Sequence, residues 1–267
     1  KQLNTFVQRK SLSAEQKINF TCMKTHLETK ALFAGYNPAD NHGAVKPPMH
    51  PASTFVFPSA AVGAAHMETA YGVEGAETPP EGGFIYSRLG NPTLSVAESR
   101  LSAWDESDAA AVFASGMAAI STMLFALTGA EKPLWYVGPL YGGTQHIIDD
   151  ILPSMGVSVR RLEHLEELAS LSESDGLPGM IYLETPANPT LQIHSIKTAA
   201  DWAKKYTSED HRIIVAVDNT FLGPILQRPL ELGADLNIYS ATKYIGGHSV
   251  LIAGAVSGEA EAMAKVF

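Results

Sequence analysis

The chain has 267 residues, of which 45% are hydrophobic, and its formal net charge at neutral pH is -9. This composition is sufficient for a sizeable buried core, and the negative charge argues against nucleic acid or an anionic membrane as a partner. There is no run of about 18 apolar residues, no CxxC pair and no His-rich spacing, so we expect neither a membrane span nor a metal site, and the single cysteine, Cys22, suits a reducing compartment such as the cytoplasm.

The N-terminal third of the sequence does not show the periodicity of a folded core. Residues 1–22 are predominantly basic, and we expect a disordered tail, with a transit-like peptide or sequence upstream of a start at Met23 as alternatives. Residues 23–90 are predicted to form an arm for subunit contacts. From Asn37 to about Gly90 the sequence is rich in Pro, Gly and small side chains, which predicts an extended chain with one short helix at Ala60–Thr69. Such an arm is stable only when it lies against another subunit.

From residue 91 to residue 267, apolar strands alternate with helical patterns. We expect strands at Ala109–Phe113, Leu134–Val137, Val157–Leu162, Met180–Leu183, Ile213–Val217, Leu236–Tyr239 and Leu251–Val256, with helices at Met117–Leu127, Thr144–Leu152, Lys197–Lys205 and Glu259–Val266. This alternation predicts an α/β domain with a mostly parallel sheet flanked by helices. Ligands of such sheets bind at the carboxyl ends of the strands.

Lys243 follows the apolar segment 233–239 and lies among hydroxyl and glycine neighbours, in Ser240-Ala241-Thr242-Lys243-Tyr244-Ile245-Gly246-Gly247. A single lysine is usually a solvated surface charge. A lysine at a strand end inside an α/β domain is expected to be buried, which frees its amine to attack a carbonyl group. The pattern therefore favours Schiff-base chemistry with an aldehyde cofactor.

Asp218 meets the second requirement of a pyridine-aldehyde cofactor, which is a carboxylate beside the ring nitrogen. It follows the apolar run Ile213–Val217, so a buried strand delivers one carboxylate at its carboxyl end. Asp in this place is also a common turn residue. The pairing with Lys243, one strand-loop-strand unit later, favours the functional interpretation.

A third requirement is a phosphate site, and Ser115-Gly116-Met117 supplies a candidate between a predicted strand and a predicted helix. Free backbone N–H groups at a helix N-terminus bind anions. Ser-Gly before a helix is also an ordinary cap, so this signal depends on the others. Ser240 and Thr242 could add hydroxyl contacts to the same phosphate.

Four ordered motifs together resemble the Cys/Met-metabolism family of pyridoxal-phosphate enzymes, the trans-sulfuration group. They are Tyr86-Ser87-Arg88-Leu89-Gly90-Asn91-Pro92-Thr93, Ser115-Gly116-Met117-Ala118, Glu184-Thr185-Pro186-Ala187-Asn188-Pro189-Thr190, and Asp218-Asn219-Thr220-Phe221 with Ser240-Ala241-Thr242-Lys243-Tyr244. The resemblance extends from about Ala34 to the end of the chain and implies fold type I of the pyridoxal-phosphate enzymes. A nicotinamide dehydrogenase is disfavoured, because no Gly-x-Gly-x-x-Gly follows a first strand.

The resemblance implies a role for each motif residue. Lys243 would bind the cofactor aldehyde and shuttle protons, and Asp218 would pair with the pyridinium nitrogen. Tyr141 would stack on the cofactor ring and protonate the leaving thiolate, and Asn188 would hydrogen-bond the phenolic oxygen. The phosphate would be bound by Gly116 and Met117 through backbone N–H groups, with Ser115, Ser240 and Thr242 beside them.

For Tyr86 and Arg88 the resemblance implies a role in subunit assembly. In the family this tyrosine and arginine reach the cofactor phosphate of a neighbouring subunit, and a guanidinium group suits a bidentate phosphate contact. The resemblance therefore implies a homo-oligomer, in the form of a dimer of dimers (homotetramer).

The implied reaction is carbon–sulfur bond chemistry at the γ-carbon of a sulfur amino acid or an O-acylhomoserine. It would be either γ-elimination or γ-replacement of the cystathionine γ-synthase or O-acylhomoserine sulfhydrylase type. Gly143 stands where many methionine γ-lyases carry cysteine, whereas the arm segments 35–38 and 42–45 resemble the γ-lyases.

The family also has a small C-terminal domain, with an arginine that binds the substrate carboxylate. Since this chain ends at Phe267, we expect that domain to be absent from it. The alternatives are a truncated product, a partial gene, half of a split enzyme completed by a second chain, and a non-catalytic subunit that pairs with a complete homologue.

Overall fold

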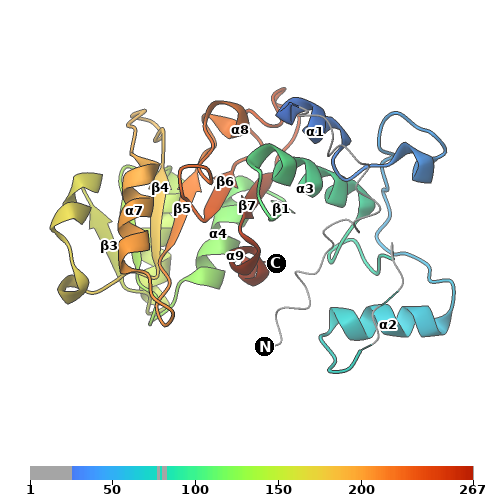
Figure 1. The fold of residues 1–267 in the computed structure, drawn as a ribbon, viewed down its shortest axis with the longest axis horizontal. Coiled ribbons are helices and arrows are strands. Elements are labelled where there is room, and N and C mark those ends of the chain that lie inside the picture. Colours follow the sequence, from blue (N-terminus) through green and yellow to red (C-terminus); the bar gives the residue numbers. More distant parts are fainter. Residues whose placement is uncertain (1–25, 77–78, 80–82, 267) are drawn as a thin grey trace. The chain divides into compact units, whose positions relative to one another are not determined.

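The computed structural model describes residues 26–76, 79 and 83–266. The expectation of a disordered tail over residues 1–22 lies outside this range. The chain divides into two compact units, one ending at Trp104 and the other comprising Asp105–Val266 (Figure 1).

The first unit is helical where it has regular structure. Its elements are α1 (Leu27–Phe33), the 3-10 helix η2 (Pro38–Asn41), α2 (Ala60–Ala70) and α3 (Pro92–Asp105), the last of which ends in the second unit. The predicted helix at Ala60–Thr69 is confirmed by α2. The expectation of a single helix in the arm was wrong, because α1 and η2 also lie within residues 23–90. α3, which follows the arm, was not predicted; it begins at Pro92, whose fixed φ suits the first helical position, and the side chain of Asn91 accepts the N–H of Thr93 at 2.8 Å.

Side-chain hydrogen bonds hold the irregular part of this unit. The Nδ2 of Asn91 donates to the carbonyl of His50 at 3.0 Å, and the N–H of His50 donates to the hydroxyl of Thr93 at 2.9 Å. Thr54 and Tyr86 form an isolated antiparallel bridge. The segment around residue 50 is thereby fixed against the segment that leads into α3.

The second unit is an α/β domain, as predicted. Its strands are β1 (Ala109–Phe113), β2 (Leu134–Val137), β3 (Val159–Leu162), β4 (Met180–Glu184), β5 (Ile214–Asp218), β6 (Leu236–Tyr239) and β7 (Gly254–Gly258). Its helices are α4 (Gly116–Leu127), α5 (Gly142–His146), the π-helix η3 (Ile147–Ile151), α6 (Leu152–Ser154), the 3-10 helices η4 (Leu165–Ser170) and η5 (Glu173–Asp175), α7 (Ile196–Tyr206), α8 (Gly223–Leu226) and α9 (Ala260–Val266).

The seven strands form one sheet in the order β1-β7-β6-β5-β4-β2-β3. β7 pairs antiparallel with both β1 and β6, and every other pairing is parallel, so six strands point the same way. The prediction of a mostly parallel sheet is confirmed. The strand expected at Leu251–Val256 begins only at Gly254, because the side chains of 250–252 are exposed and the strand's buried residues start later.

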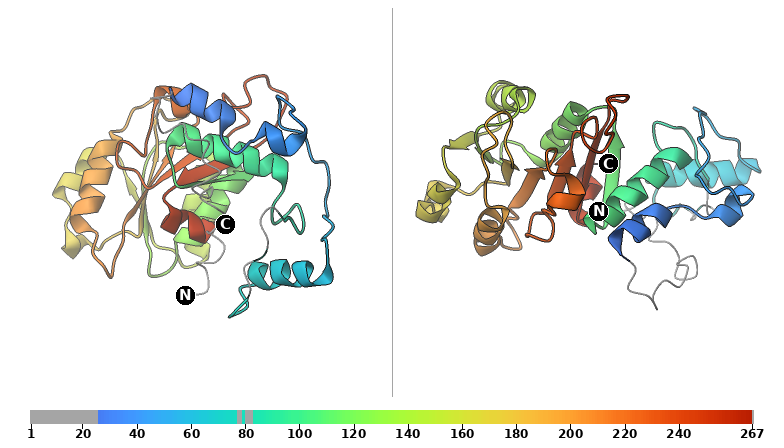
Figure 2. Two further views of the ribbon diagram at one scale, coloured as in Figure 1. Left: turned by 45° about the vertical axis from the view of Figure 1, so that its right-hand side comes forward. Right: turned by 90° about the horizontal axis from the view of Figure 1, so that it is seen from above.

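Helices cover both faces of this sheet. α4, η3 and α9 bury their apolar side chains against one face, and α7 and η4 against the other. The view from above shows α4 and α7 on opposite sides of the strands (Figure 2). Neighbouring strand residues alternate between the two cores, as Ala216 and Val217 do, which explains why the strands are apolar throughout.

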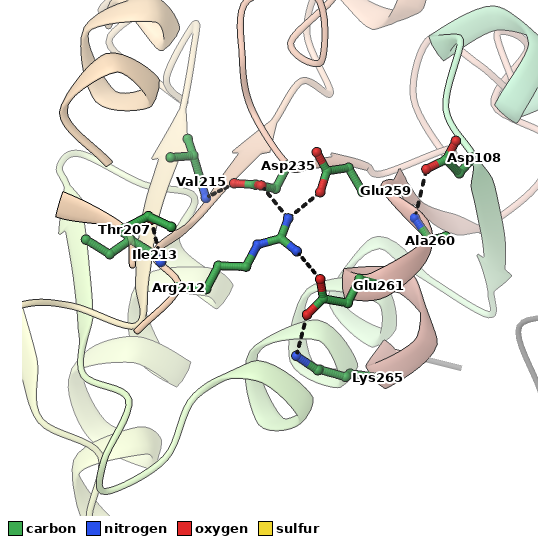
Figure 3. Close-up of polar contacts among 10 residues, drawn as sticks. All are labelled: Asp108, Thr207, Arg212, Ile213, Val215, Asp235, Glu259, Ala260, Glu261 and Lys265. Atoms are coloured by element: carbon green, nitrogen blue, oxygen red, sulfur yellow. Dashed lines mark hydrogen bonds and ion pairs between the residues drawn. The ribbon is translucent and has the colours of Figure 1, made fainter. Parts of the chain in front are cut away.

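A cluster of charged side chains lies at the edge of the sheet where the parallel strands begin. Arg212, just before β5, donates to Asp235 at 2.9 Å and to Glu261 at 2.7 Å, and also binds Glu259 (Figure 3). Asp235 precedes β6 and also accepts the N–H of Val215 at 2.7 Å. The cluster thereby ties the starts of two strands to the chain leading into α9.

Candidate functional site

The residues that the sequence singled out in the second unit follow the carboxyl ends of the parallel strands. Ser115 comes shortly after β1, Asp218 is the last residue of β5, and Ser240 directly follows β6. Because these strands are parallel, their carboxyl ends share one edge of the sheet. Hydrogen bonds and close contacts then link the residues into one site.

The N-terminus of α4 offers free N–H groups at this edge. Ser115 is the N-cap, and its hydroxyl accepts the N–H of Ala118 at 3.0 Å while its carbonyl accepts that of Ala119 at 3.0 Å. The N–H groups of Gly116 and Met117 are left without an intrahelical acceptor. Two donors at a helix N-terminus suit a phosphate.

Gly116 brings this helix end against the end of β6. A Cβ atom at Gly116 would lie 2.7 Å from the Cβ and 2.8 Å from the Oγ of Ser240, closer than real atoms approach. A Cβ at Gly254, the first residue of β7, would collide with the carbonyl of Ser115. Glycine at both positions therefore allows the start of α4 to approach the sheet this closely. We call the start of α4 at Gly116 and Met117, together with the adjoining Ser240, the cradle.

Thr220 connects Ser240 to Asp218, a role that the sequence did not reveal. Its hydroxyl donates to Oδ1 of Asp218 at 2.6 Å and accepts the backbone N–H of Ser240 at 2.8 Å. The backbone N–H of Thr220 also donates to the same carboxylate oxygen at 3.0 Å. The carboxylate and the end of β6 are thus held together by one side chain.

Lys243 lies one turn beyond Ser240, and its backbone N–H donates to the carbonyl of Ser240 at 3.0 Å. The expectation of a buried lysine is wrong for this chain, since Lys243 is exposed. After β6 the chain forms a turn over residues 241–246 instead of continuing a buried strand. The hydroxyl of Thr242 both donates to the carbonyl of Ala253 and accepts its N–H, each at 3.0 Å, so its proton is engaged there.

Asp218 is a buried carboxylate without a cation. It is only 5% exposed, and burial raises its pKa against the lowering effect of the hydrogen bonds from Thr220. In the described ranges no ion pair involves Asp218, and the nearest hydroxyl besides Thr220 is that of Tyr182, at 3.5 Å. A protonated ring nitrogen would supply the missing positive charge.

Glu184 is a second buried carboxylate, which the sequence interpretation did not assign. It ends β4 and lies in register with Asp218 of β5. Its Oε2 accepts the N–H of Tyr141 at 2.6 Å and its Oε1 the N–H of Asn188 at 2.8 Å. Burial, and then the charge of Asp218, raise the pKa of Glu184 to about 7. The available signal was a carboxylate ending a wholly apolar strand, as Asp218 does in the next strand.

Tyr141 contributes a half-exposed ring beside the start of α4. A Cβ atom at Gly143 would lie 2.9 Å from Cε1 of Tyr141 and 3.0 Å from the sulfur of Met117. The phenol ring and the cradle are therefore near neighbours, with Gly143 between them. Because Gly143 has no side chain, there is room for the Tyr141 ring at this position.

Tyr86 and Arg88 belong to the first unit. Both side chains are exposed, and the guanidinium carbon of Arg88 lies 5.4 Å from the centre of the Tyr86 ring, a cation–π contact. The structure brings these two residues together. Their role at a cofactor phosphate stays a prediction.

The second unit's residues fit a phosphorylated aldehyde of a protonated pyridine. The cradle at Gly116 has two free N–H donors, Asp218 lacks a cation, and Lys243 supplies an amine on the turn that leaves Ser240. Among the described residues no group of three His, Cys, Asp or Glu side chains has the arrangement of a metal site. None of the helices in the described ranges has the length and apolar run that a membrane crossing needs.

Comparison with known proteins gives consistent matches over most of the chain. The model of the Cys/Met metabolism PLP-dependent enzymes matches residues 28–267. L-Methionine gamma-lyase of Pseudomonas deceptionensis is 40% identical over 229 residues, 85% of this chain and 54% of that protein. Cystathionine gamma-synthase of Mycobacterium leprae is 35% identical, with 91% and 57% covered.

The solved structures agree with these relatives. Cystathionine gamma-lyase from Lactobacillus plantarum, crystallised with L-serine, superposes with a TM-score of 0.73 at 32% identity, over 91% of this chain and 57% of that one. The structure of metB from Corynebacterium glutamicum gives a TM-score of 0.76 at 29% identity, with the same coverage. The chain thus spans a little over half the length of the relatives that it matches.

Proposed function

Because this chain belongs to the family of Cys/Met metabolism PLP-dependent enzymes, we propose that it binds pyridoxal 5'-phosphate and takes part in carbon–sulfur bond chemistry at the γ-carbon of a sulfur amino acid. The observation that carries the proposal is the linked set Gly116, Ser240, Thr220 and Asp218. It joins an anion cradle to a buried carboxylate that has no cation, beside the turn that bears Lys243.

The cofactor's two charged ends would be held at different strand ends. Gly116 and Met117 would donate N–H groups to the phosphate, with Ser115, Ser240 and Thr242 beside it. Asp218 would keep the ring nitrogen protonated, and Asn188 would hydrogen-bond the phenolic oxygen. Bound pyridoxal phosphate supplies an electron sink that is conjugated to the substrate amine.

Lys243 and Tyr141 would transfer protons to and from the substrate. The amine of Lys243, exposed on its turn, has the freedom to bind the aldehyde and then to carry a proton between the substrate's α-carbon and its neighbours. The phenol of Tyr141 would give a proton to the departing sulfur. Its ring would lie over the bound cofactor and exclude water from that face.

Lys243 can be tested directly by chemical trapping. Purified protein mixed with pyridoxal phosphate is expected to show a visible absorption band, and borohydride reduction followed by peptide mass spectrometry should locate the cofactor on Lys243. Lys243→Ala should abolish the adduct, whereas Lys204→Ala, an exposed lysine of α7, should leave it unchanged. A reduced adduct on another lysine, or none in the wild type, would sink the assignment.

The substrate proposal follows from the names of the relatives, which are lyases and synthases of sulfur amino acids. Candidate substrates are methionine, cystathionine and O-acylhomoserine. Release of 2-oxobutanoate with a free thiol would establish γ-elimination. Formation of a new thioether from O-acylhomoserine and an added thiol would establish γ-replacement. If no substrate gives either product although the cofactor adduct forms, the reaction part of the proposal is wrong.

Assembly and location complete the proposal. Tyr86 and Arg88 are exposed and paired, which suits a role at the cofactor phosphate of a neighbouring subunit. We therefore expect a homotetramer built as a dimer of dimers. The expected location is the cytoplasm. Light scattering of the cofactor-loaded protein measures the number of subunits.

A further inference from the structure

Glu184 occupies a place between two loops that carry proposed functional residues. It is 4% exposed and ends β4. One carboxylate oxygen accepts the backbone N–H of Tyr141 at 2.6 Å, and the other accepts that of Asn188 at 2.8 Å. Tyr141 precedes α5 and Asn188 lies in the turn after β4, so a single side chain fixes the backbone of both.

Only the ionised carboxylate satisfies both donors well. It has two acceptor oxygens, one for each N–H. A protonated carboxyl group places a hydroxyl opposite one of them, and an amide places an NH2 group there. Each neutral form would leave one buried N–H poorly paired, which weakens the hold on one loop.

The surroundings of Glu184 oppose its ionisation. The titratable groups that face it are Asp218 from β5 and Tyr182 from its own strand. In the described part of the chain no ion pair includes Glu184. Burial and the neighbouring Asp218 raise its pKa to about 7, so the two backbone N–H groups are what favours the charged form. Protonation of Glu184 near neutral pH would therefore change its hydrogen-bonding capacity.

We propose that Glu184 is a positioning residue that holds Tyr141 and Asn188 at the site by accepting their backbone N–H groups, and that it releases this hold on protonation. The inference rests on the proposed function for the roles of those two residues. The hold itself exists without a cofactor. It can therefore be measured on the cofactor-free protein.

Amide hydrogen exchange of the cofactor-free chain provides the test, with peptides that cover residues 139–143 and 186–190. At pH 8, Glu184→Gln is expected to raise exchange by about tenfold at one of the two amides, Tyr141 or Asn188, because the N–H that faces the new NH2 group loses its charge-assisted hydrogen bond. Asp105→Asn is the matched control, because Asp105 is also a buried carboxylate with a raised pKa but binds Tyr239 and Ser257 instead. It should leave exchange in both peptides unchanged.

The wild-type chain supplies a second measurement that needs no variant. After correction for the intrinsic pH dependence of exchange, protection of at least one of the two amides should fall between pH 8 and pH 6. In Glu184→Gln it should stay constant. Unchanged protection in Glu184→Gln, equal losses in Asp105→Asn, or a flat wild-type profile would each overturn the proposal.

Cofactor titration separates this inference from the proposed function. If the wild type binds pyridoxal phosphate, Glu184→Gln should weaken the affinity by about tenfold, because the loops that carry Tyr141 and Asn188 are held less firmly in the variant. If the wild type binds no pyridoxal phosphate but the exchange results hold, the proposed function fails and the positioning role stands. If binding is normal and the exchange results fail, the reverse is true.

Discussion

Asp218 and Glu184 end neighbouring strands and lie in register, so two carboxylates share a buried environment at the site. The third buried carboxylate of the described residues, Asp105 at the end of α3, accepts hydrogen bonds from Tyr239 and Ser257 on its two separate oxygens. Asp218 has its firm hydrogen bonds on one oxygen only, with Tyr182 at 3.5 Å from the other. Two buried carboxylates that oppose each other's ionisation thus lie where we propose that a cationic ring nitrogen binds.

Asp218→Asn is expected to stabilise the cofactor-free protein at pH 8. Burial raises the folded-state pKa of Asp218, so the stability that this group contributes is fully present below its unfolded pKa and is lost as pH rises through the folded pKa. The asparagine variant has no such loss. Its free energy of unfolding should exceed that of the wild type at pH 8, and the difference should shrink as the pH falls towards the unfolded-state pKa of an aspartate.

Urea denaturation at pH 8 and at acidic pH, followed by circular dichroism, measures this difference. The same substitution should weaken binding of pyridoxal phosphate by at least about tenfold, because the partner of the ring nitrogen is neutral. A variant that is less stable than the wild type at pH 8 would show that the Asp218 charge is already compensated within the chain.

Single residues also show what the sequence could and could not predict. Asp218 and Ser240 are recognisable because a polar residue that follows a buried strand lies at the carboxyl edge of a parallel sheet. Thr220 and Glu184 were missed because each also accepts a backbone N–H from far along the chain, that of Ser240 for Thr220 and that of Tyr141 for Glu184, and such pairings cannot be predicted from the local sequence. The expectation for Lys243 was wrong in burial, because the turn after β6 leaves the sheet.

At the scale of elements, the site depends on how closely α4 approaches β6 and β7. Ser115 caps the helix in an extended conformation, and the glycines at 116 and 254 remove the atoms that would separate helix and sheet. α4 also packs on the same face as α9, which fixes its axis. The free N–H groups of its first turn are therefore rigidly placed for an anion.

Gly116→Ala should damage the cradle without a backbone-conformation penalty. The new methyl carbon would lie 2.9 Å from Cα of Ser240, a backbone atom that cannot rotate away, so helix and strand must separate. We expect a loss of about 1–3 kcal/mol in the free energy of unfolding and at least tenfold weaker binding of pyridoxal phosphate. Denaturant titration and cofactor titration measure the two effects.

Gly129→Ala is the matched control, since nothing lies within 4 Å of the Cβ position at Gly129, in the turn after α4. It should bind cofactor as the wild type does. Equal cofactor affinity in Gly116→Ala would contradict the assignment of this helix end to the phosphate.

The elements themselves were largely predictable, since a wholly apolar strand and a capped amphipathic helix have clear signals. β7 was placed too early because the exposed residues 250–252 are as apolar as the strand, and composition alone cannot separate the two. α3 was missed although Asn91-Pro92 marks its start, because the arm around it has no periodicity. Its hydrogen bonds with His50 depend on a segment more than forty residues earlier in the chain.

At the scale of the whole Asp105–Val266 unit, the two edges of the sheet have different tasks. The carboxyl edge holds the proposed cofactor site, where the buried carboxylates Asp218 and Glu184 form no ion pair with a described residue. The amino edge holds the cluster around Arg212, in which every charge has an opposite charge nearby (Figure 3). The charged cluster that we expect to stabilise the unit and the proposed cofactor site therefore lie at opposite ends of the strands.

This separation predicts that Arg212→Leu lowers stability without changing the site. Asp235 is partly buried and would lose its cation, so we expect a loss of about 1–3 kcal/mol in the free energy of unfolding. Glu261→Gln removes only an exposed partner of the same arginine and should change stability by less than about 0.5 kcal/mol. Urea denaturation compares the two variants with the wild type. Both should bind pyridoxal phosphate with wild-type affinity in the absence of urea, because no contact of the cluster extends to Asp218 or Gly116; a more than threefold weaker affinity in Arg212→Leu would mean that the two edges of the sheet are coupled.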